Sequence, residues 1–157
     1  MAPVDVEAAI RAVLDPEIPV ITLDDLGVIR SIEVEGDIVH VVMTPTYSGC
    51  PAMDAMRERV QHVIEAAGLT AAIEVTLQPA WTTDLISARG RTALRQFGIA
   101  PPGERGAVVV PLGRRIVACP VCGSEDTEVT SAFGATACKA LRRCRSCKEP
   151  FEEFKTL

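Results

Sequence analysis

The chain has 157 residues and a formal net charge of −5, with 48% hydrophobic and 24% charged residues. This composition is typical of globular proteins and excludes a wholly disordered chain. No apolar run reaches the ~18 residues that a membrane-spanning helix needs. The acidic start, with Asp5 and Glu7, lacks the basic and apolar regions of a secretory signal, so we expect a cytoplasmic protein with no membrane partner.

The first half of the chain begins with a predicted helix followed by a hairpin. Apolar residues recur on one helical face over residues 5–14, and Asp5 suits the N-cap position. The prolines of Asp15-Pro16-Glu17-Ile18-Pro19 end this helix. Residues 29–35, once Arg30 is skipped, alternate in the manner of a strand, and the apolar residues 38–43 predict its partner.

A second helix is predicted over residues 51–67, where apolar side chains form a stripe and Gly68 provides a stop. Alternation at Ile73, Val75 and Leu77 predicts a third strand. Residues 83–97 are expected to be helical and broken at Gly90. This order of elements predicts an α/β (α+β) fold, a small sandwich with its helices packed on one sheet.

The rest of the chain predicts a linker and a small second domain. Prolines and glycines concentrate between residues 98 and 113, around one short apolar strand over residues 107–110. The ~40 residues that follow are too few to build a core of their own and need a staple. We therefore expect an α/β domain over residues 1–100, a linker over 101–116 and a stapled domain over 117–157.

Four of the six cysteines form two Cys-x2-Cys pairs separated by 21 residues, namely Cys119, Cys122, Cys144 and Cys147. This spacing is typical of a zinc ribbon, in which four thiolates complete a tetrahedral structural Zn²⁺ site. Iron held by the same four ligands is an alternative, and so are unpaired structural thiols. The fifth cysteine of this region, Cys138, cannot join a filled site, and we expect it to be a small buried residue.

The charge of this region has two interpretations. From Arg114 onward there are 8 basic and 6 acidic residues, whereas the first 113 residues carry −7. A basic tail can bind nucleic acid. Four thiolates with one Zn²⁺ sum to −2, however, so we expect the basic residues to compensate the metal site rather than to bind nucleic acid. They are Arg142, Arg143, Arg145 and Lys148.

The remaining cysteine, Cys50, lies in Ser48-Gly49-Cys50-Pro51. Because proline favours the first helical position, Cys50 is predicted at the N-cap of the second helix. The positive end of the helix dipole lowers a thiol pKa, so Cys50 is a candidate reactive thiolate or metal-handling ligand. The alternative is a buried cysteine at a helix start.

Together these motifs resemble a known family. The segments 15–19, 25–29 and 44–51 are similar to the small α/β domain of SufT-like iron–sulfur assembly proteins. The segments 79–84 and 97–102 and the cysteine-containing tail resemble the D subunit of the phenylacetyl-CoA epoxidase system. In the tail the resemblance includes Cys138. It covers nearly the whole chain, and the combination of the two parts is what is specific.

The resemblance implies an accessory subunit, not itself catalytic, of the monooxygenase that epoxidises the ring of phenylacetyl-CoA in aerobic phenylacetate catabolism. The implied partners are its di-iron oxygenase and flavin/[2Fe–2S] reductase subunits, and the implied role is metal or iron–sulfur maturation. Cys50 matches the reactive cysteine of the assembly domain, with Glu17 and Thr44 as candidate neighbours. Structural zinc and transient iron or an iron–sulfur unit are the expected cofactors.

Three alternatives stay open at this point. The chain could be a non-catalytic structural component of the oxygenase complex. It could be a zinc-ribbon regulator that binds nucleic acid, although the net acidity disfavours this. A homo-oligomer is also open, because nothing in the sequence determines the oligomeric state.

Overall fold

The structure is a computed structural model, and it describes residues 5–103 and 115–157. The chain divides into two compact units, which are described separately. The first unit comprises residues up to Trp81 together with Leu85–Gly90, and the second comprises Thr82–Asp84 together with Arg91–Leu157. The domain boundaries expected at residues 100 and 117 remain predictions. The strand expected over residues 107–110 lies outside the described residues.

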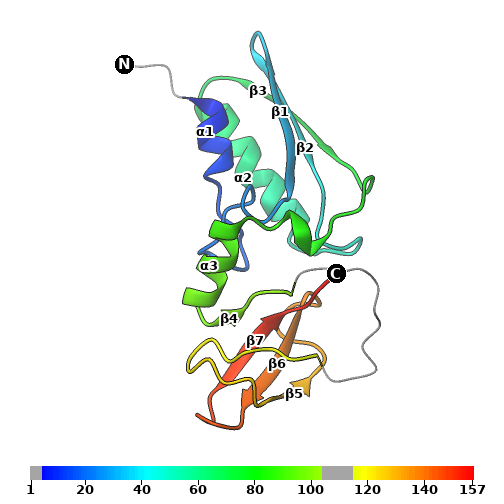
Figure 1. The fold of residues 1–157 in the computed structure, drawn as a ribbon. Coiled ribbons are helices and arrows are strands. Elements are labelled where there is room, and N and C mark those ends of the chain that lie inside the picture. Colours follow the sequence, from blue (N-terminus) through cyan, green and yellow to red (C-terminus); the bar gives the residue numbers. More distant parts are fainter. Residues whose placement is uncertain (1–4, 104–114) are drawn as a thin grey trace. The chain divides into compact units, whose positions relative to one another are not determined.

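The first unit is a three-stranded sheet with two helices, as expected (Figure 1). Its elements are α1 (Val6–Arg11), β1 (Ile29–Glu35), β2 (Ile38–Met43), α2 (Met53–Ala66) and β3 (Thr70–Val75). The strand order is β1-β2-β3, with β1 antiparallel and β3 parallel to β2. Both predicted hairpin strands are confirmed, whereas the third strand begins and ends earlier than its alternation suggested.

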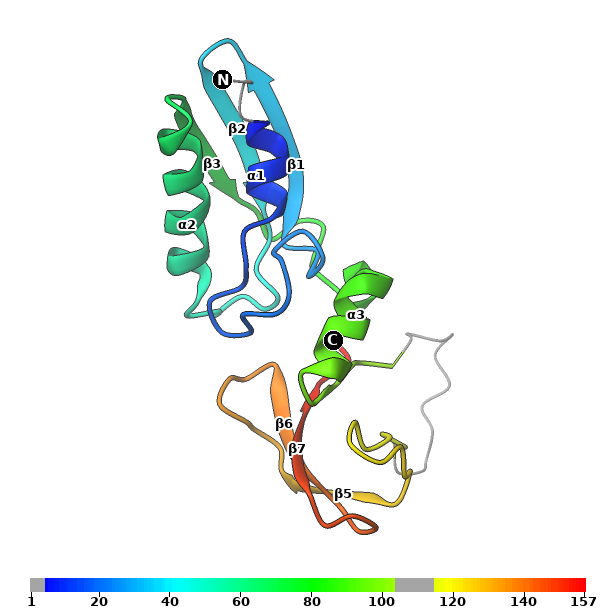
Figure 2. The ribbon, with the colours of Figure 1, turned by 90° about the vertical axis from the view of Figure 1, so that its left-hand side faces the viewer.

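Both helices of the first unit pack on the same face of this sheet (Figure 2). On β2 the side chains of Val39, Val41 and Met43 alternate toward the helices and are almost fully buried. The facing stripe of α2 contributes Met56, Val60 and Ile64, as its spacing predicted. The core of the unit therefore lies between one sheet face and two helices.

The irregular start of β1 explains its broken alternation. The register shifts between Ile29 and Ser31, so Arg30 is an extra residue that no residue of β2 opposes. A bulge of this kind restores the period of two on the far side of the extra residue. Gly36, with a φ of 60°, makes the turn into β2.

The predicted break at Gly90 is wrong. A short 3-10 helix, η1 (Thr83–Leu85), is followed by α3 (Ala88–Gln96), which runs through Gly90 without interruption. The break falls instead at Ser87, whose hydroxyl accepts a hydrogen bond from the Gly90 N–H at 2.9 Å. Gly90 is required for close packing, because a Cβ there would lie 2.9 Å from Cδ1 of Ile21 and 3.0 Å from the carbonyl oxygen of Asp25.

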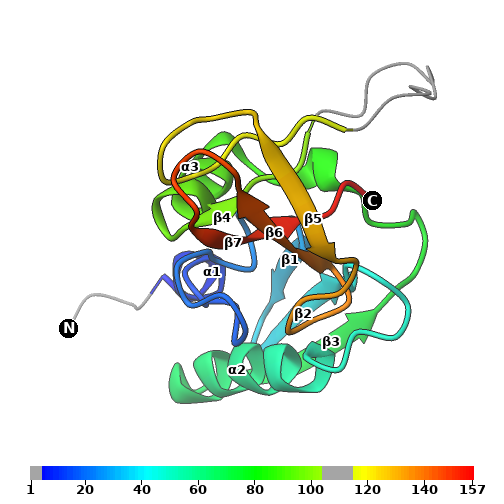
Figure 3. The ribbon, with the colours of Figure 1, turned by 90° about the horizontal axis from the view of Figure 1, so that it is seen from below.

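The second unit contains a four-stranded sheet in the order β4-β7-β6-β5, seen in Figure 3. Its strands are β4 (Ile99–Ala100), β5 (Thr127–Ser131), β6 (Lys139–Cys144) and β7 (Pro150–Phe154). β4 pairs in parallel with β7, so residues 99–100 contribute to this sheet. Its core is small and includes Ala100, Val117, Phe151 and two cysteines. In the described parts of the chain, no helix is long and apolar enough to cross a membrane.

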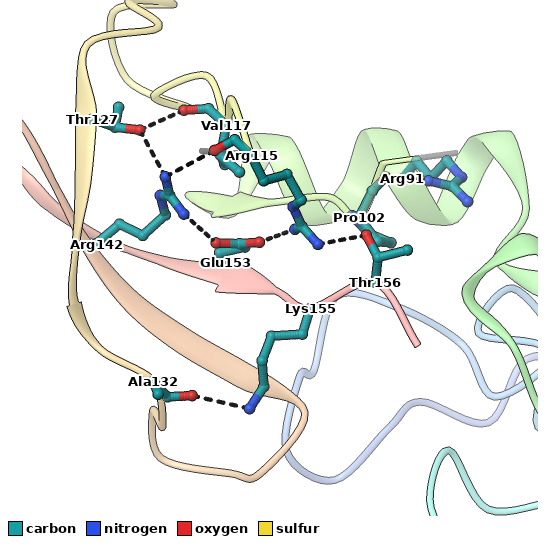
Figure 4. Close-up of polar contacts among 10 residues, drawn as sticks. All are labelled: Arg91, Pro102, Arg115, Val117, Thr127, Ala132, Arg142, Glu153, Lys155 and Thr156. Carbon is teal, nitrogen blue, oxygen red and sulfur yellow. Dashed lines mark hydrogen bonds and ion pairs between the residues drawn. The ribbon is translucent and has the colours of Figure 1, made fainter. Parts of the chain in front are cut away.

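A buried ionic network crosses this sheet (Figure 4). Glu153 on β7 accepts from Arg142 on β6 at 2.8 Å and also from Arg115, and it is only 4% exposed. Thr127 on β5 accepts from Arg142 at 3.3 Å and donates to the carbonyl of Val117 at 2.7 Å. The network ties β5, β6 and β7 to the segment that leads into the first cysteine pair.

Candidate functional site

The four cysteines of the two Cys-x2-Cys pairs meet at one point in the second unit. Their sulfur atoms all lie within 4.8 Å of one another. Sγ of Cys119 is 3.8 Å from that of Cys147, and Sγ of Cys122 is 3.6 Å from that of Cys144. Zn–S bonds of about 2.3 Å in a tetrahedron place sulfur atoms about 3.8 Å apart. The sulfur positions therefore fit a tetrahedral metal site.

The backbone of each pair turns in the same way to bring its sulfur atoms together. Gly123, directly after Cys122, has a φ of 75°, and Lys148, directly after Cys147, has a φ of 70°. The Gly123 N–H donates to the carbonyl of Cys119 at 2.9 Å. Glycine is the usual residue at positive φ, so Lys148 is the strained member of the two.

The pKa values of Cys144 and Cys147, the second cysteine pair, are shifted in opposite directions. The Cys147 N–H, joined by that of Ser146, lowers the pKa of Cys144 to about 6 against the opposing effect of burial. The Glu149 N–H also favours ionised Cys147. Burial and the neighbouring sulfur atoms outweigh it and raise the pKa of Cys147 to about 12. The two thiols of this pair therefore differ in how readily they ionise, because neighbouring sulfur atoms that both carry a charge repel each other.

The expected compensation of the cluster by nearby basic residues is wrong for two of them. Arg142 donates to Glu153, and Arg145 donates to Glu128 at 2.8 Å. Carboxylates on neighbouring strands therefore take up these charges. Lys148 donates to the carbonyl of Arg145 at 2.5 Å.

Cys138 does not belong to the metal cluster. Its sulfur lies 3.1 Å from Oγ1 of Thr136, and its carbonyl accepts from the Lys155 N–H at 2.9 Å. The side chain is half-buried rather than buried as expected. It thus sits in the loop between β5 and β6 and supports the end of β7.

The loop between β2 and α2 carries Cys50 in the first unit. The predicted N-cap position of Cys50 is wrong, because α2 begins at Met53 with Ala52 as its N-cap. Cys50 precedes the helix by one turn: its N–H donates to Tyr47 at 3.1 Å, and its carbonyl accepts from Met53 at 3.3 Å. The side chain is half-buried. Cys50 is therefore not the N-cap residue on which the helix-dipole argument rested.

The candidate neighbours of Cys50 lie on two loops: Glu17 on the loop that leads into β1, and Thr44 on the loop that follows β2. These loops meet the sheet at the same end, because Ile29 at the start of β1 pairs with Met43 at the end of β2. Glu17 lies on the loop after α1 and is exposed. Thr44 directly follows β2 and is 1% exposed, and its buried Oγ1 has no hydrogen-bond partner among the residues that the structure describes. A buried, unsatisfied hydroxyl is costly, so Thr44 is an unusual feature of this loop.

Asp15 is a residue that sequence reasoning undervalued. Its carboxylate is not solvated, because Asp15 is 2% exposed. Its Oδ1 accepts from the N–H groups of Glu17 at 2.8 Å and Ile18 at 2.7 Å. Burial raises its pKa, against these two hydrogen bonds. The available signal was an aspartate at the start of a proline-containing turn, because aspartate side chains accept hydrogen bonds from the backbone two residues further on.

Comparisons with known proteins match two separate segments of the chain to two different families. Residues 3–77 match the family model described as iron–sulfur cluster assembly protein, and residues 106–155 match the PaaD zinc beta ribbon domain. A solved DUF59 domain from Bacillus anthracis shares the fold, with a TM-score of 0.52 and 24% identity. It covers 57% of this chain, which in turn covers 87% of that domain.

Two curated proteins are similar in sequence. One is the D subunit of an Escherichia coli K12 enzyme named "Putative 1,2-phenylacetyl-CoA epoxidase"; it is 42% identical over 98% of this chain and 92% of its own length. The other is an Fe-S protein maturation auxiliary factor from Porphyromonas gingivalis W83. It is 40% identical over 53% of this chain and 81% of its own length.

The fold and the cysteine cluster thus define a two-part protein, an iron–sulfur-assembly-type α/β unit joined to a zinc ribbon. The ribbon family and the thiol cluster both indicate zinc binding. On its similarity over nearly its whole length, the chain belongs to the PaaD family, the D subunits of phenylacetyl-CoA epoxidases.

Proposed function

We propose that this chain is an accessory subunit of a phenylacetyl-CoA ring 1,2-epoxidase and assists the maturation of a metal or iron–sulfur centre in a partner subunit. The observation that carries the proposal is the union of two parts in one chain. An assembly-type unit resembling a maturation factor is joined to the ribbon of the PaaD family. The clients are the reductase or the di-iron oxygenase subunit of that system.

In this proposal Cys50 is the thiol that handles the metal or cluster in transit. It is half-buried on the loop between β2 and α2, the loop that Thr44 begins. A half-buried thiol can reach a partner and yet avoid permanent exposure to oxidants. Glu17, exposed on the neighbouring loop, is proposed as a further contact of the transferred metal.

The zinc ribbon has a structural role in the same proposal. Zinc would be held by Cys119, Cys122, Cys144 and Cys147, which together fill a tetrahedral site. The bound ion crosslinks two knuckles of a unit whose core is small, and such sites contribute folding free energy directly. Chemistry at Cys50 and zinc at the ribbon are therefore separate functions.

The test is whole-cell epoxidase activity in a strain that lacks the native gene and carries variants of this chain. We expect Cys50→Ser to lose most of the activity while its thermal unfolding is unchanged. Cys138→Ser, which alters a half-buried cysteine outside the zinc cluster, is the matched control and should retain activity. Full growth of the Cys50→Ser strain on phenylacetate would contradict the role of Cys50.

A second candidate function is a stoichiometric, non-catalytic component of the oxygenase complex. It is favoured by the name of the Escherichia coli relative, which makes that protein a subunit of the epoxidase. This function predicts that the chain co-purifies with active oxygenase in fixed ratio, regardless of the residue at position 50. An oxygenase that is fully active after maturation and removal of this chain would exclude it.

A further inference from the structure

The sheet of the first unit has one face that its helices leave uncovered. We call it the open sheet face, and it carries every second residue of the three strands. Its nine positions are Ser31, Glu33, Glu35, Ile38, His40, Val42, Thr70, Ala72 and Glu74. The alternate residues, such as Val39 and Val41, are buried under α1 and α2, so these nine point the other way. Figure 1 shows both helices on a single side of the sheet within this unit.

This face has an apolar centre between acidic borders. The central strand presents Ile38, which is 42% exposed, with His40 and Val42. The outer strands carry glutamates, Glu33 and Glu35 on β1 and Glu74 on β3, all exposed. An apolar centre ringed by polar groups is the usual anatomy of a protein–protein interface.

The face lacks cations of its own. Arg30, the extra residue of the bulge, is the only lysine or arginine on the three strands. The first unit as a whole contains 13 acidic residues, 5 arginines and no lysine. Two of these arginines are engaged elsewhere, Arg11 with Glu7 and Asp24, and Arg89 with Asp25. Among the described residues, no ion pair joins a lysine or arginine to the glutamates of the open sheet face, and His40 lies 3.9 Å from the carboxylate of Glu35.

We propose that the open sheet face docks a cationic amphipathic helix of a partner protein. Three strands about 4.8 Å apart span about 10 Å, which matches the diameter of a helix. Apolar side chains of that helix would cover Ile38 and Val42, and its lysines or arginines would reach the glutamates on both borders. The docked helix would complete a sheet covered on both faces, a stable layer arrangement. This proposal does not depend on the chemistry of Cys50.

Titration of the isotope-labelled full chain by NMR tests the proposal. The probe is a synthetic helical peptide of about 18 residues with leucines on one side and lysines on the other. A second peptide with glutamates in place of the lysines controls for apolar contact alone. We expect the lysine peptide to shift the amide signals of β1, β2 and β3 around His40, Val42 and Ala72, and the glutamate peptide to leave them unchanged.

Charge reversal provides the matched comparison. Glu33→Lys with Glu35→Lys should weaken peptide binding by about tenfold or more, because the added charges repel the probe. Glu58→Lys with Glu65→Lys changes the net charge equally on the exposed side of α2 and should weaken it less than about twofold. Equal weakening by both pairs, or signal shifts centred on α2, would overturn the proposal. So would self-association of the wild-type chain that Glu33→Lys with Glu35→Lys abolishes, because a second copy would then occupy the face.

Discussion

The guanidinium of Arg142 donates a hydrogen bond to the carboxylate of Glu153 at 2.8 Å, and both side chains are almost fully buried in the second unit. Arg115 supplies a second cation to the same carboxylate (Figure 4). Burial, with the nearby charge of Arg115, lowers the pKa of Arg142. Glu153 thus holds together two cations that would otherwise repel each other.

Replacing Glu153 by glutamine should destabilise the second unit by about 3 kcal/mol, because a buried pair that loses one partner leaves an uncompensated charge. Hydrogen exchange of the β6 and β7 amides, with zinc present, measures the effect. Glu152→Gln removes the partner of Lys139 from a more exposed position on the same strand, and it should cost less than half as much. Equal losses would show that burial of the Glu153 network contributes little.

Removing zinc should unfold the second unit and leave the first folded. The second unit has few buried apolar residues apart from its metal cluster, and small ribbons of this kind gain their stability from the metal. A chelator should therefore abolish protection of the β5–β7 amides. It should leave unchanged the fluorescence of Trp81, the single tryptophan, which is buried in the first unit.

The cluster residues and Cys138 should differ in zinc content. Cys144→Ser removes one of the four ligands that we propose, so purified protein should contain much less than one zinc per chain. Cys138→Ser should retain the full amount, because its sulfur contacts Thr136 and lies outside the cluster. Elemental analysis of both variants measures this directly. A loss of zinc from Cys138→Ser equal to that from Cys144→Ser would contradict the assignment.

Asp25 should make the stability of the first unit depend on pH. Burial acts to raise its pKa, but hydrogen bonds from Ser87, Arg89 and Thr22 outweigh burial and lower it below the ordinary value of 3.8. A carboxyl with a lowered pKa stabilises the folded state above the unfolded-state pKa, and this stability is lost as the pH falls through the folded-state pKa.

The variant Asp25→Asn should therefore be less stable than the wild type by about 1–2 kcal/mol at pH 6. The difference should shrink as the pH falls below about 4. Urea unfolding followed by Trp81 fluorescence measures it, because the Trp81 indole N–H donates to the carbonyl of Leu26, next to Asp25. Asp24→Asn, altered at the exposed pair with Arg11, is the control. A difference that does not change with pH would contradict the ionic role of Asp25.

Gly90→Ala should destabilise the first unit, although alanine favours helices by about 1 kcal/mol over glycine. The new Cβ would lie within 3.0 Å of Ile21 and of the backbone of Asp25. Overpacking of this kind costs about 1–3 kcal/mol. Gln96→Ala, exposed near the end of the same helix, should change stability by less than about 0.5 kcal/mol. A stabilised Gly90→Ala variant would show that the neighbouring residues yield easily.

The apolar run of β2 and the helical stripe of α2 predicted these two elements of the first unit, because both patterns contain the side chains that the core buries. The same patterns could not show that α3 continues through Gly90. A glycine within a helical pattern suggests a break. At Gly90 the glycine instead makes room for Ile21, a contact that the local sequence does not reveal. Contacts between residues far apart in the chain carry no local signal.

The metal cluster was the most predictable part of the site, since the spacing of two cysteine pairs nearly determines its geometry. The partners of the arginines were not predictable, because Glu153 faces Arg142 only once β6 and β7 are paired. At Cys50 the rule that proline favours the first helical position gave the wrong helix start. Proline at position 51 suggested a helix start, whereas the chain makes a further turn before Met53.

The most direct test of the maturation role is the iron–sulfur cluster content of the reductase subunit. The reductase is purified after co-expression with the wild-type chain, with Cys50→Ser, or without this chain. A maturation role predicts a filled cluster beside the wild type and a depleted cluster in the other two cases, as measured by iron and sulfide analysis and by visible absorption. Equal cluster content in all three preparations, together with a fully metallated di-iron subunit, would contradict a maturation role.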